Sequence, residues 1–245
     1  MPAICGSYAR GKVMRLTRLD ECGTPVPGPT GTLVTKGFVS VGMTPNYQDP
    51  EEVTQADANG DLCIDDQGRP ALRWVDLSMV FCNIDPEAIN IITGNPLVVN
   101  DATPTPSSVG WRLDGDLTGT ANFGLEVWSG KTGQSCGTGG LEYGYWLWPY
   151  VVQARIGEAT IANAALTLTL TARTSTGSGW GVGPYDVTKS AVTPFPEGPL
   201  ATAIGAAQHQ HFEVTTVAPP TPGCGAIALA APAEGLVAAQ VLEPA

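Results

Sequence analysis

The chain has 245 residues, of which 43% are hydrophobic and 14% charged, so it suits one large β domain or two small ones with a buried core. Glycine and proline together make up about a fifth of the chain without a G-X-Y period or helical heptads, which excludes collagen, coiled coils and helical bundles. Its 12 Lys and Arg against 23 Asp and Glu give a net charge of −11, which disfavours tight binding of nucleic acid.

Two predicted strands and an acidic loop open the chain. Residues 11–19 alternate between two faces, and residues 32–42 are rich in β-branched and aromatic side chains. Residues 43–66 then contain seven acids and no Lys or Arg, which predicts a solvated loop with a hairpin turn at Asn59-Gly60. The acids are Asp49, Glu51, Glu52, Asp57, Asp61, Asp65 and Asp66.

A single helix is predicted after the next strand, which covers residues 71–83. Asp85 is a good N-cap residue, Pro86 suits the first helical position, and Gly94 suits a helix end. No other segment has both start and stop signals of this quality. The sequence therefore predicts one short helix over residues 86–93.

The remainder of the chain predicts further strands at roughly regular spacing, separated by Gly-rich turns. This pattern favours a mainly β fold: a β-sandwich or partial barrel with one short flanking α-helix, a long loop between early strands, and extended termini. Residues 175–183 and 194–199 are predicted loops, residues 219–222 a stiff linker, and residues 227–245 a loosely attached arm. The predicted strands are residues 109–113, 121–128, 141–156, 164–173 and 212–217.

The cysteines and the N-terminus predict a reduced, cytosolic product. Six cysteines are scattered over more than two hundred residues, unlike the dense spacing of a disulfide scaffold. The first residues lack a basic region followed by an apolar one, and no uncharged apolar run is long enough to span a membrane. We therefore expect no membrane insertion.

The charges are distributed unevenly along the chain. Four of the twelve basic residues, Arg10, Lys12, Arg15 and Arg18, lie in or beside the first predicted strand, whereas residues 43–66 are acidic. Opposite charges on separate parts of one chain suit head-to-tail association of identical copies. The alternative is that both groups are simply solvated surface.

One segment matches a catalytic motif. Residues 133–137 (GQSCG) fit the G-x-S-x-G pattern around Ser135, and Asp186 followed by His209 or His211 gives the chain order of α/β-hydrolase triads. A nucleophile elbow needs a strand before it and a helix after it, and here an aromatic strand follows instead. The motif is therefore interpreted as a turn, and no enzyme is predicted.

Candidate metal ligands form incomplete sets. Four side chains of the acidic loop have the spacing of EF-hand ligands, but Leu62 replaces the required Gly and Gly68 the closing Glu. His209 and His211 have no third ligand at useful spacing and are interpreted as surface histidines. We therefore predict an acidic hairpin and no metal or other cofactor. The EF-hand-like positions are Asp57, Asn59, Asp61 and Asp65.

An aromatic run in residues 143–150 offers a possible sugar-binding platform. Successive strand residues point to opposite faces, so Tyr143 and Tyr145 separate from Trp146 and Trp148. Such a split favours a core on one face and a subunit contact through Trp146 and Trp148 on the other.

Four segments resemble a known family. The chain is similar to the major tail proteins, or tail tube proteins, of phages with long non-contractile tails that infect actinobacteria. The resemblance spans most of residues 5–220. The segments are CGSYARGKVMRLTRLDECGTPVPG, GFVSVGMTPNYQDPEEVTQADANGDLCIDD, RWVDLSMVFCNIDPEAINIITGNP and LEYGYWLWPYVVQARIG.

The resemblance implies a structural virion protein. Six copies would close into a ring with a continuous inner barrel, and rings would stack into a tube that is assembled in the host bacterial cytoplasm. The implied partners are the chain itself, the tape measure protein, the tail terminator and tail tip proteins, and double-stranded DNA that passes through the lumen without specific binding. An acidic lumen suits this role, because attraction to phosphate would slow a sliding polyanion.

The resemblance also implies a division of the chain. Residues 1–11 would be an N-terminal arm, residues 12–218 the tube domain with a stacking loop at 43–66, and residues 219–245 a C-terminal arm. The alternatives are a monomeric virion-decoration or carbohydrate-binding β-sandwich and a serine hydrolase using Ser135. The expected contact residues of the stacking loop are Pro45, Asn46, Tyr47, Asp49, Glu51, Glu52 and Asp57.

Overall fold

The computed structural model describes residues 6–100, 106–115, 121–133, 142–160, 163, 166–190 and 193–230. The protein is mainly β, with 54% strand and 4% helix, and every strand pair in it is antiparallel. Within the described ranges there is one short helix, α1 (Pro86–Thr93). The predicted fold class is therefore confirmed.

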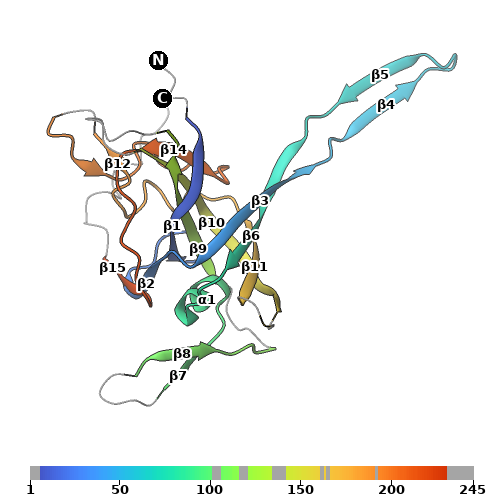
Figure 1. Cartoon of the computed structure of the whole chain (residues 1–245). Coiled ribbons are helices and arrows are strands. Elements are labelled where there is room, and N and C mark those ends of the chain that lie inside the picture. The colour runs from blue at the N-terminus through green and yellow to red at the C-terminus, as the bar shows by residue number, and fades with distance from the viewer. Residues whose placement is uncertain are drawn as a thin grey trace.

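Nine strands form one large sheet (Figure 1). Its strand order is β15-β2-β1-β9-β10-β11-β6-β3, and β14 pairs with the first half of the long strand β10. The strands are β1 (Tyr8–Leu19), β2 (Gly28–Thr35), β3 (Phe38–Gln48), β6 (Ala71–Phe81), β9 (Asn122–Lys131), β10 (Tyr143–Thr160), β11 (Thr167–Thr174), β14 (His211–Thr215) and β15 (Ile227–Leu229).

The connection between β2 and β3 is so short that the sheet must curve into a partial barrel. Only Lys36 and Gly37 join the two strands, although five strands separate them in the sheet. The two ends of the sheet must therefore approach each other, and a Cβ on Gly11 of β1 would lie 2.6 Å from the ring of Phe38 at the start of β3. The predicted single strand over residues 32–42 is accordingly two strands that belong to opposite ends of the sheet.

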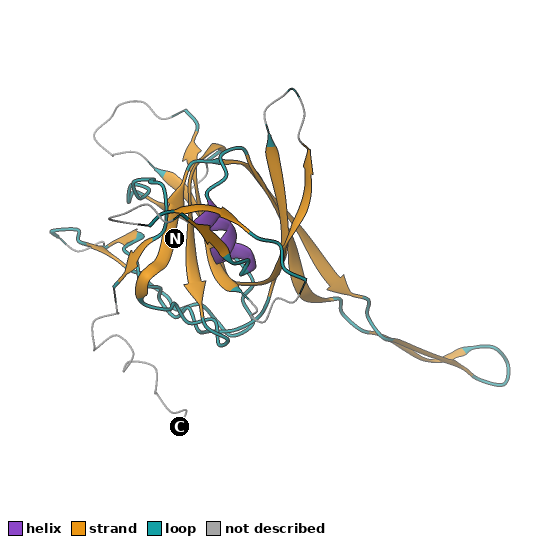
Figure 2. Cartoon of the chain, turned by 90° about the horizontal axis from the view of Figure 1, so that it is seen from below, coloured by secondary structure: helices purple, strands orange, loops and turns teal. Residues whose placement is uncertain are grey.

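The helix fills the inside of the roll, and the strands of the sheet lie around it in Figure 2. Asp85 caps it by accepting the Glu87 N–H at 2.9 Å, and Gly94 ends it with a left-handed φ of 76°, which confirms both predicted signals. Ile89, Ile91 and Ile92 are fully buried against residues of the sheet. The core on this face also contains Met14, Leu16, Leu77, Met79, Phe123, Leu125, Trp148 and Leu170.

A second core covers the opposite face of the central strands. Residues 175–190 and 193–210 fold over β9 and β10, and Trp180 packs where a Cβ on Gly124 would overlap its ring. The strands β12 (Thr188–Lys189) and β13 (Glu197–Gly198) form a small hairpin in this cover. Because both faces are covered, Asn122 to Trp128 of β9 are all buried.

The acidic segment, predicted as a solvated loop with a hairpin turn and as an acidic hairpin, forms a long β-hairpin. Beyond the paired strands β3 and β6, the chain continues as β4 (Glu52–Ala56) and β5 (Leu62–Gln67), which pair with each other and project from the body (Figure 1). The predicted turn is confirmed, since Gly60 has a φ of 91°. A smaller hairpin, β7 (Leu97–Val99) with β8 (Ser108–Trp111), packs beside α1. We call residues 49–70 the arm.

The sheet extends into both predicted terminal arms. Tyr8 to Gly11 belong to β1 and pair with β9, and Ile227 to Leu229 pair with β2. Gly225 N–H also donates to the Asp85 carboxylate at 2.7 Å, which fastens this segment to the helix start. The part of the predicted C-terminal arm up to residue 230 is therefore attached, and residues 231–245 lie outside the described residues. No helix among the described residues is long and apolar enough to cross a membrane.

Candidate assembly surface

The arm exposes apolar side chains that no part of the body covers. Every residue of β4 and β5 is exposed, and Leu62 and Ile64 retain 64% and 49% of their accessible surface. An isolated two-stranded hairpin is marginally stable in water. An exposed apolar patch of this kind marks a contact surface. The exposed large hydrophobic residues of the arm and its base are Val39, Met43, Tyr47, Val53, Leu62, Ile64 and Leu72.

The register of the arm separates its side chains into two faces. Val53 lies opposite Asp66, and Gln55 lies opposite Ile64, so these four side chains share one face. Glu52 with Gln67 and Thr54 with Asp65 alternate onto the other. One face is therefore mixed apolar and acidic, and the other is polar and acidic.

At the tip of the arm, the carboxylate of Asp57 stabilises the turn. The Asp57 carboxylate accepts the N–H groups of Asn59 at 2.8 Å and Asp61 at 2.9 Å, an arrangement that fixes the turn. Within the described part of the chain, no group of three or more His, Cys, Asp or Glu side chains is placed to hold a metal ion.

The predicted stacking-loop residues lie along one continuous hairpin. Pro45, Asn46 and Tyr47 end β3 and face Val75, Trp74 and Leu72 of β6, respectively. Asp49, Glu51, Glu52 and Asp57 follow on the arm and are all exposed. These residues are therefore available for contact with another molecule, and whether they make one stays a prediction.

Arg15 does not belong to an exposed basic surface. It is 6% exposed, and its Nε and Nη2 donate to the two carboxylate oxygens of Glu126 at 2.5 Å each. Tyr145 donates its hydroxyl to the same carboxylate at 2.6 Å, and the Arg15 guanidinium lies 3.3 Å from the Tyr185 ring centroid. Glu126 is directly opposite Arg15 in the β1–β9 register, so the prediction of Arg15 as an interface residue is wrong.

Burial and the Arg15–Glu126 ion pair shift the pKa values of the groups in this network. Burial lowers the pKa of Arg15, but the adjacent Glu126 carboxylate outweighs burial and leaves this pKa raised. Burial, reinforced by Glu126, raises the pKa of Tyr145 well above its usual value and also raises the pKa of Tyr185. Arg15 therefore stays protonated and Tyr145 and Tyr185 stay neutral at neutral pH, and the network serves the fold.

The other three predicted basic residues, Arg10, Lys12 and Arg18, differ in exposure. Arg18 is half-buried and links three elements, because its Nε donates to the Thr30 carbonyl at 2.9 Å and its Nη2 to the Asn90 side chain of α1. Burial lowers the pKa of Arg18. Arg10 and Lys12 are exposed at the irregular start of β1. The basic strand available for contact is thus reduced to Arg10 and Lys12.

The predicted interface tryptophans are covered by their own chain. Trp148 is 4% exposed and lies in the core around α1. Trp146 is half-buried, donates its Nε1–H to Ser129 at 3.0 Å, and stacks on Phe212 with ring centroids 4.3 Å apart. The pairing of β14 with β10 places Phe212 over Trp146, so Trp148 is wrong as an interface residue and Trp146 is largely covered.

A groove of about 540 Å³ gathers lysines that are distant in the sequence. Lys12 comes from β1, Lys36 from the β2–β3 connection and Lys131 from the end of β9. Lys131 is hydrogen-bonded to Glu142, which raises the pKa of Lys131. We call this site the lysine groove. Sequence reasoning missed it because only the strand pairing brings these residues together. Its other lining residues are Val13, Gly130, Tyr143, Pro219, Pro220, Thr221 and Pro222.

A second groove, of about 500 Å³, lies on the outer face of β3, β6, β11 and β10. Two guanidinium groups lie near the indole ring of Trp74, with the Cζ of Arg73 4.6 Å and the Cζ of Arg173 5.1 Å from the ring centroid. Trp74 Nε1–H also donates to the Asp76 carboxylate at 3.1 Å. Arg155 completes the charged lining, and we call this site the arginine groove.

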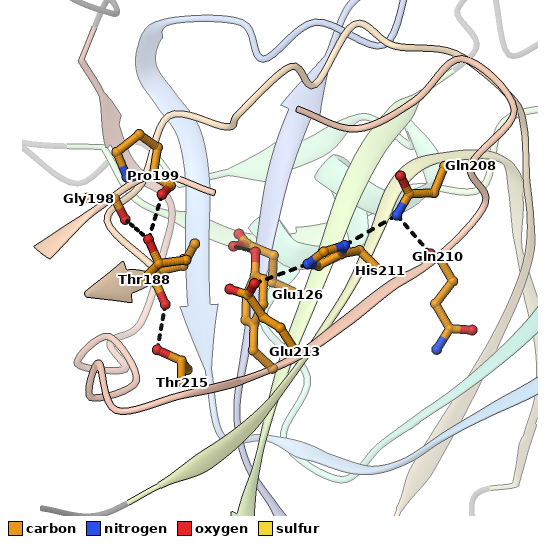
Figure 3. Close-up of polar contacts among 11 residues, drawn as sticks. Glu126, Thr188, Gly198, Pro199, Gln208, Gln210, His211, Glu213 and Thr215 are labelled. Carbon is orange, nitrogen blue, oxygen red and sulfur yellow. Dashed lines mark hydrogen bonds and ion pairs between the residues drawn. The ribbon is translucent and has the colours of Figure 1, made fainter. Parts of the chain in front are cut away.

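The histidines lie in two different environments. His209 is buried, with its Nδ1 2.8 Å from the Thr174 hydroxyl, and burial lowers its pKa, so its interpretation as a surface residue is wrong. His211 lies between Gln208 and Glu213 (Figure 3), with Nε2 3.3 Å from the Glu213 carboxylate. Ser135, the nucleophile in the serine hydrolase hypothesis, lies outside the described residues.

Comparison with known proteins assigns no family. No protein-family model matches the chain, and no curated protein is significantly similar to it. The function is therefore inferred from the arm, the sheet edges and the charged grooves.

Proposed function

We propose that the protein is the subunit of a phage tail tube. Six copies close into a ring, rings stack through the arm, and the tube holds the tape measure protein and later conducts double-stranded DNA into the host. The observation that carries this proposal is the arm, a hairpin whose apolar side chains are all exposed. Burial of such residues between copies removes apolar surface from water, which stabilises association.

The edges of the large sheet offer a second contact. Strand β3 pairs with β6 on one side and, among the described strands, with none on the other. A row of unpaired N–H and C=O groups at a sheet edge is a template for pairing with another chain. In a ring, β3 of one copy would extend the sheet of the next into a continuous inner barrel.

Passive conduction agrees with the charge of the chain. A net charge of −11 repels phosphate, so DNA slides through without the many simultaneous bonds that would stop it. The remaining partners are the tail terminator and tail tip proteins at the two ends of the tube. The protein acts in the virion tail and needs no cofactor for this role.

Light scattering and negative-stain microscopy of the purified protein over a range of concentrations test the proposal. We expect rings or tubes of uniform width at high concentration. A protein that stays a monodisperse monomer at all concentrations contradicts it and favours the alternative, a monomeric virion-decoration or carbohydrate-binding module.

A matched pair of variants tests whether assembly depends on the arm. V53S/I64S removes two exposed apolar side chains from the arm, and V109S/L113S removes two exposed apolar side chains from the body. We expect the first variant to raise the concentration needed for assembly about tenfold or more, the equivalent of about 1.4 kcal/mol. The second variant should assemble like the wild type.

A further inference from the structure

We propose that the lysine groove is the receptor for the acidic arm of a second copy of the chain. This inference rests on the proposed function, because it requires that copies associate. It adds the site at which one copy holds the next and the residues on each side of the contact.

The lysine groove is a cationic site on an anionic protein. Its lining contains Lys12, Lys36 and Lys131 against one acid, Glu142, which is already engaged by Lys131. Lys12 and Lys36 are exposed, and no ion pair is found for either among the residues that the structure describes. The Lys12 side chain lies across Gly130, where a Cβ would come within 2.8 Å of its Cε.

The groove also has an apolar side. The tail segment that follows β14 runs along it and contributes Pro219, Pro220 and Pro222, and Tyr143 of β10 lies beside them. Proline rings and an aromatic side chain offer apolar contact surface without flexible side chains that would lose entropy on binding. The groove thus combines two exposed ammonium groups with a rigid apolar wall.

The arm has the complementary features. Residues 43–66 contain seven acids and no Lys or Arg. On one face of the arm, Val53 and Ile64 lie next to Asp66, so carboxylate and apolar groups are presented together. An acidic and apolar face matches a cationic and apolar groove in both kinds of interaction.

The arm cannot occupy the groove of its own chain. Lys36 stands just before the first residue of β3, and the arm begins just after its last residue. The 11 residues of β3 hold the two about 35 Å apart at roughly 3.3 Å per residue. The arm then projects away from the body (Figure 1). Contact between arm and groove is therefore between copies and head-to-tail, the geometry that builds rings and stacks.

The arginine groove is a weaker candidate for the same partner. The carboxylate of Asp76 lies within its lining and would repel acidic residues of the arm. Arg173 is also already stacked against Trp74. The arginine groove therefore serves as an internal control for the experiment.

Charge reversal of the groove is the test. K12E/K36E reverses the two exposed lysines of the lysine groove, and R155E/K189E makes the same change in charge elsewhere, with Arg155 in the arginine groove. Circular dichroism and thermal unfolding first establish that both variants fold. We expect K12E/K36E to raise the concentration for assembly tenfold or more, about 1.4 kcal/mol, and R155E/K189E to assemble like the wild type.

A charge swap and a cross-link give the direct evidence for contact. Adding D65K/D66K on the arm to K12E/K36E should restore assembly at least in part, because each copy then presents two arm lysines to the acidic groove. In the wild type, a carbodiimide should join carboxylates of residues 49–66 to Lys12 or Lys36, as seen by mass spectrometry, and only in the assembled fraction.

The outcomes separate this inference from the proposed function. Wild-type protein that never assembles overturns both. Assembly that persists in K12E/K36E, without a link from the arm to Lys12 or Lys36, overturns the inference and leaves the tube proposal standing. Loss of assembly in R155E/K189E but not in K12E/K36E would place the contact at Arg155 or Lys189 and likewise overturn it.

Discussion

The body and the arm of this protein are built from the same kind of strand but held in different ways. In the body, strands such as β9 are buried on both faces, between α1 and the cover formed by residues 175–190 and 193–210. In the arm, two strands of similar hydrogen bonding are exposed on both faces. Packing therefore stabilises the body, whereas only the turn and the strand ladder hold the arm.

This difference assigns separate roles to the two regions. A region without packed neighbours contributes little to the free energy of unfolding and is free to acquire neighbours from another molecule. A region that is packed on both faces cannot change partners without losing its core. Stability and assembly should therefore respond to different substitutions.

The largest effect is expected at the buried ion pair of the body. R15M leaves the Glu126 carboxylate, which is 0% exposed, without its charged partner and should lower the free energy of unfolding by about 3–5 kcal/mol. Denaturant unfolding measures this loss. R15M/E126L removes both charges and should be more stable than R15M. A double variant less stable than R15M would show that the pair itself, and not the orphaned charge, dominates.

A matched pair of isoleucines compares the two regions directly. Ile91 of α1 is fully buried, and I91A should cost about 2–5 kcal/mol because it leaves a cavity. Ile64 of the arm is half exposed, and I64A should change the free energy of unfolding of the monomer by less than about 0.5 kcal/mol. Denaturant unfolding at concentrations below assembly measures both. Equal losses would mean that the arm folds as part of the body.

The sequence predicts features that depend on neighbours within a few residues. The cap at Asp85, the helix end at Gly94 and the turn at Asn59-Gly60 were all predicted correctly, because each is fixed by local backbone geometry and a short-range hydrogen bond. The mainly β class followed from the same local signals.

Features that depend on long-range strand pairing could not be predicted from the sequence. Arg15 looked like a surface charge because its partner Glu126 is 111 residues away and meets it only through the β1–β9 register. Lys36 and Lys131 are united in one groove by the same rolling of the sheet. The turn of the acidic hairpin in residues 43–66 was predicted, but the length of its strands was not, because acidic, exposed strands lack the apolar alternation that normally marks a strand.

The smallest expected effect is a pH dependence that belongs to the body alone. The Thr174 hydroxyl accepts the Val75 N–H at 2.8 Å and lies 2.8 Å from His209 Nδ1, so His209 is held in the buried body of the protein. Burial lowers the pKa of His209 in the folded protein. Between that value and the unfolded pKa of about 6.5, the unfolded chain binds more protons, so the free energy of unfolding should fall as pH is lowered through this window. H209N keeps a polar side chain beside Thr174 but does not titrate, and its unfolding midpoint should fall less than that of the wild type between about pH 7.5 and pH 5.5. Identical pH profiles for the two proteins would show that His209 carries the same proton affinity in the folded and unfolded chain.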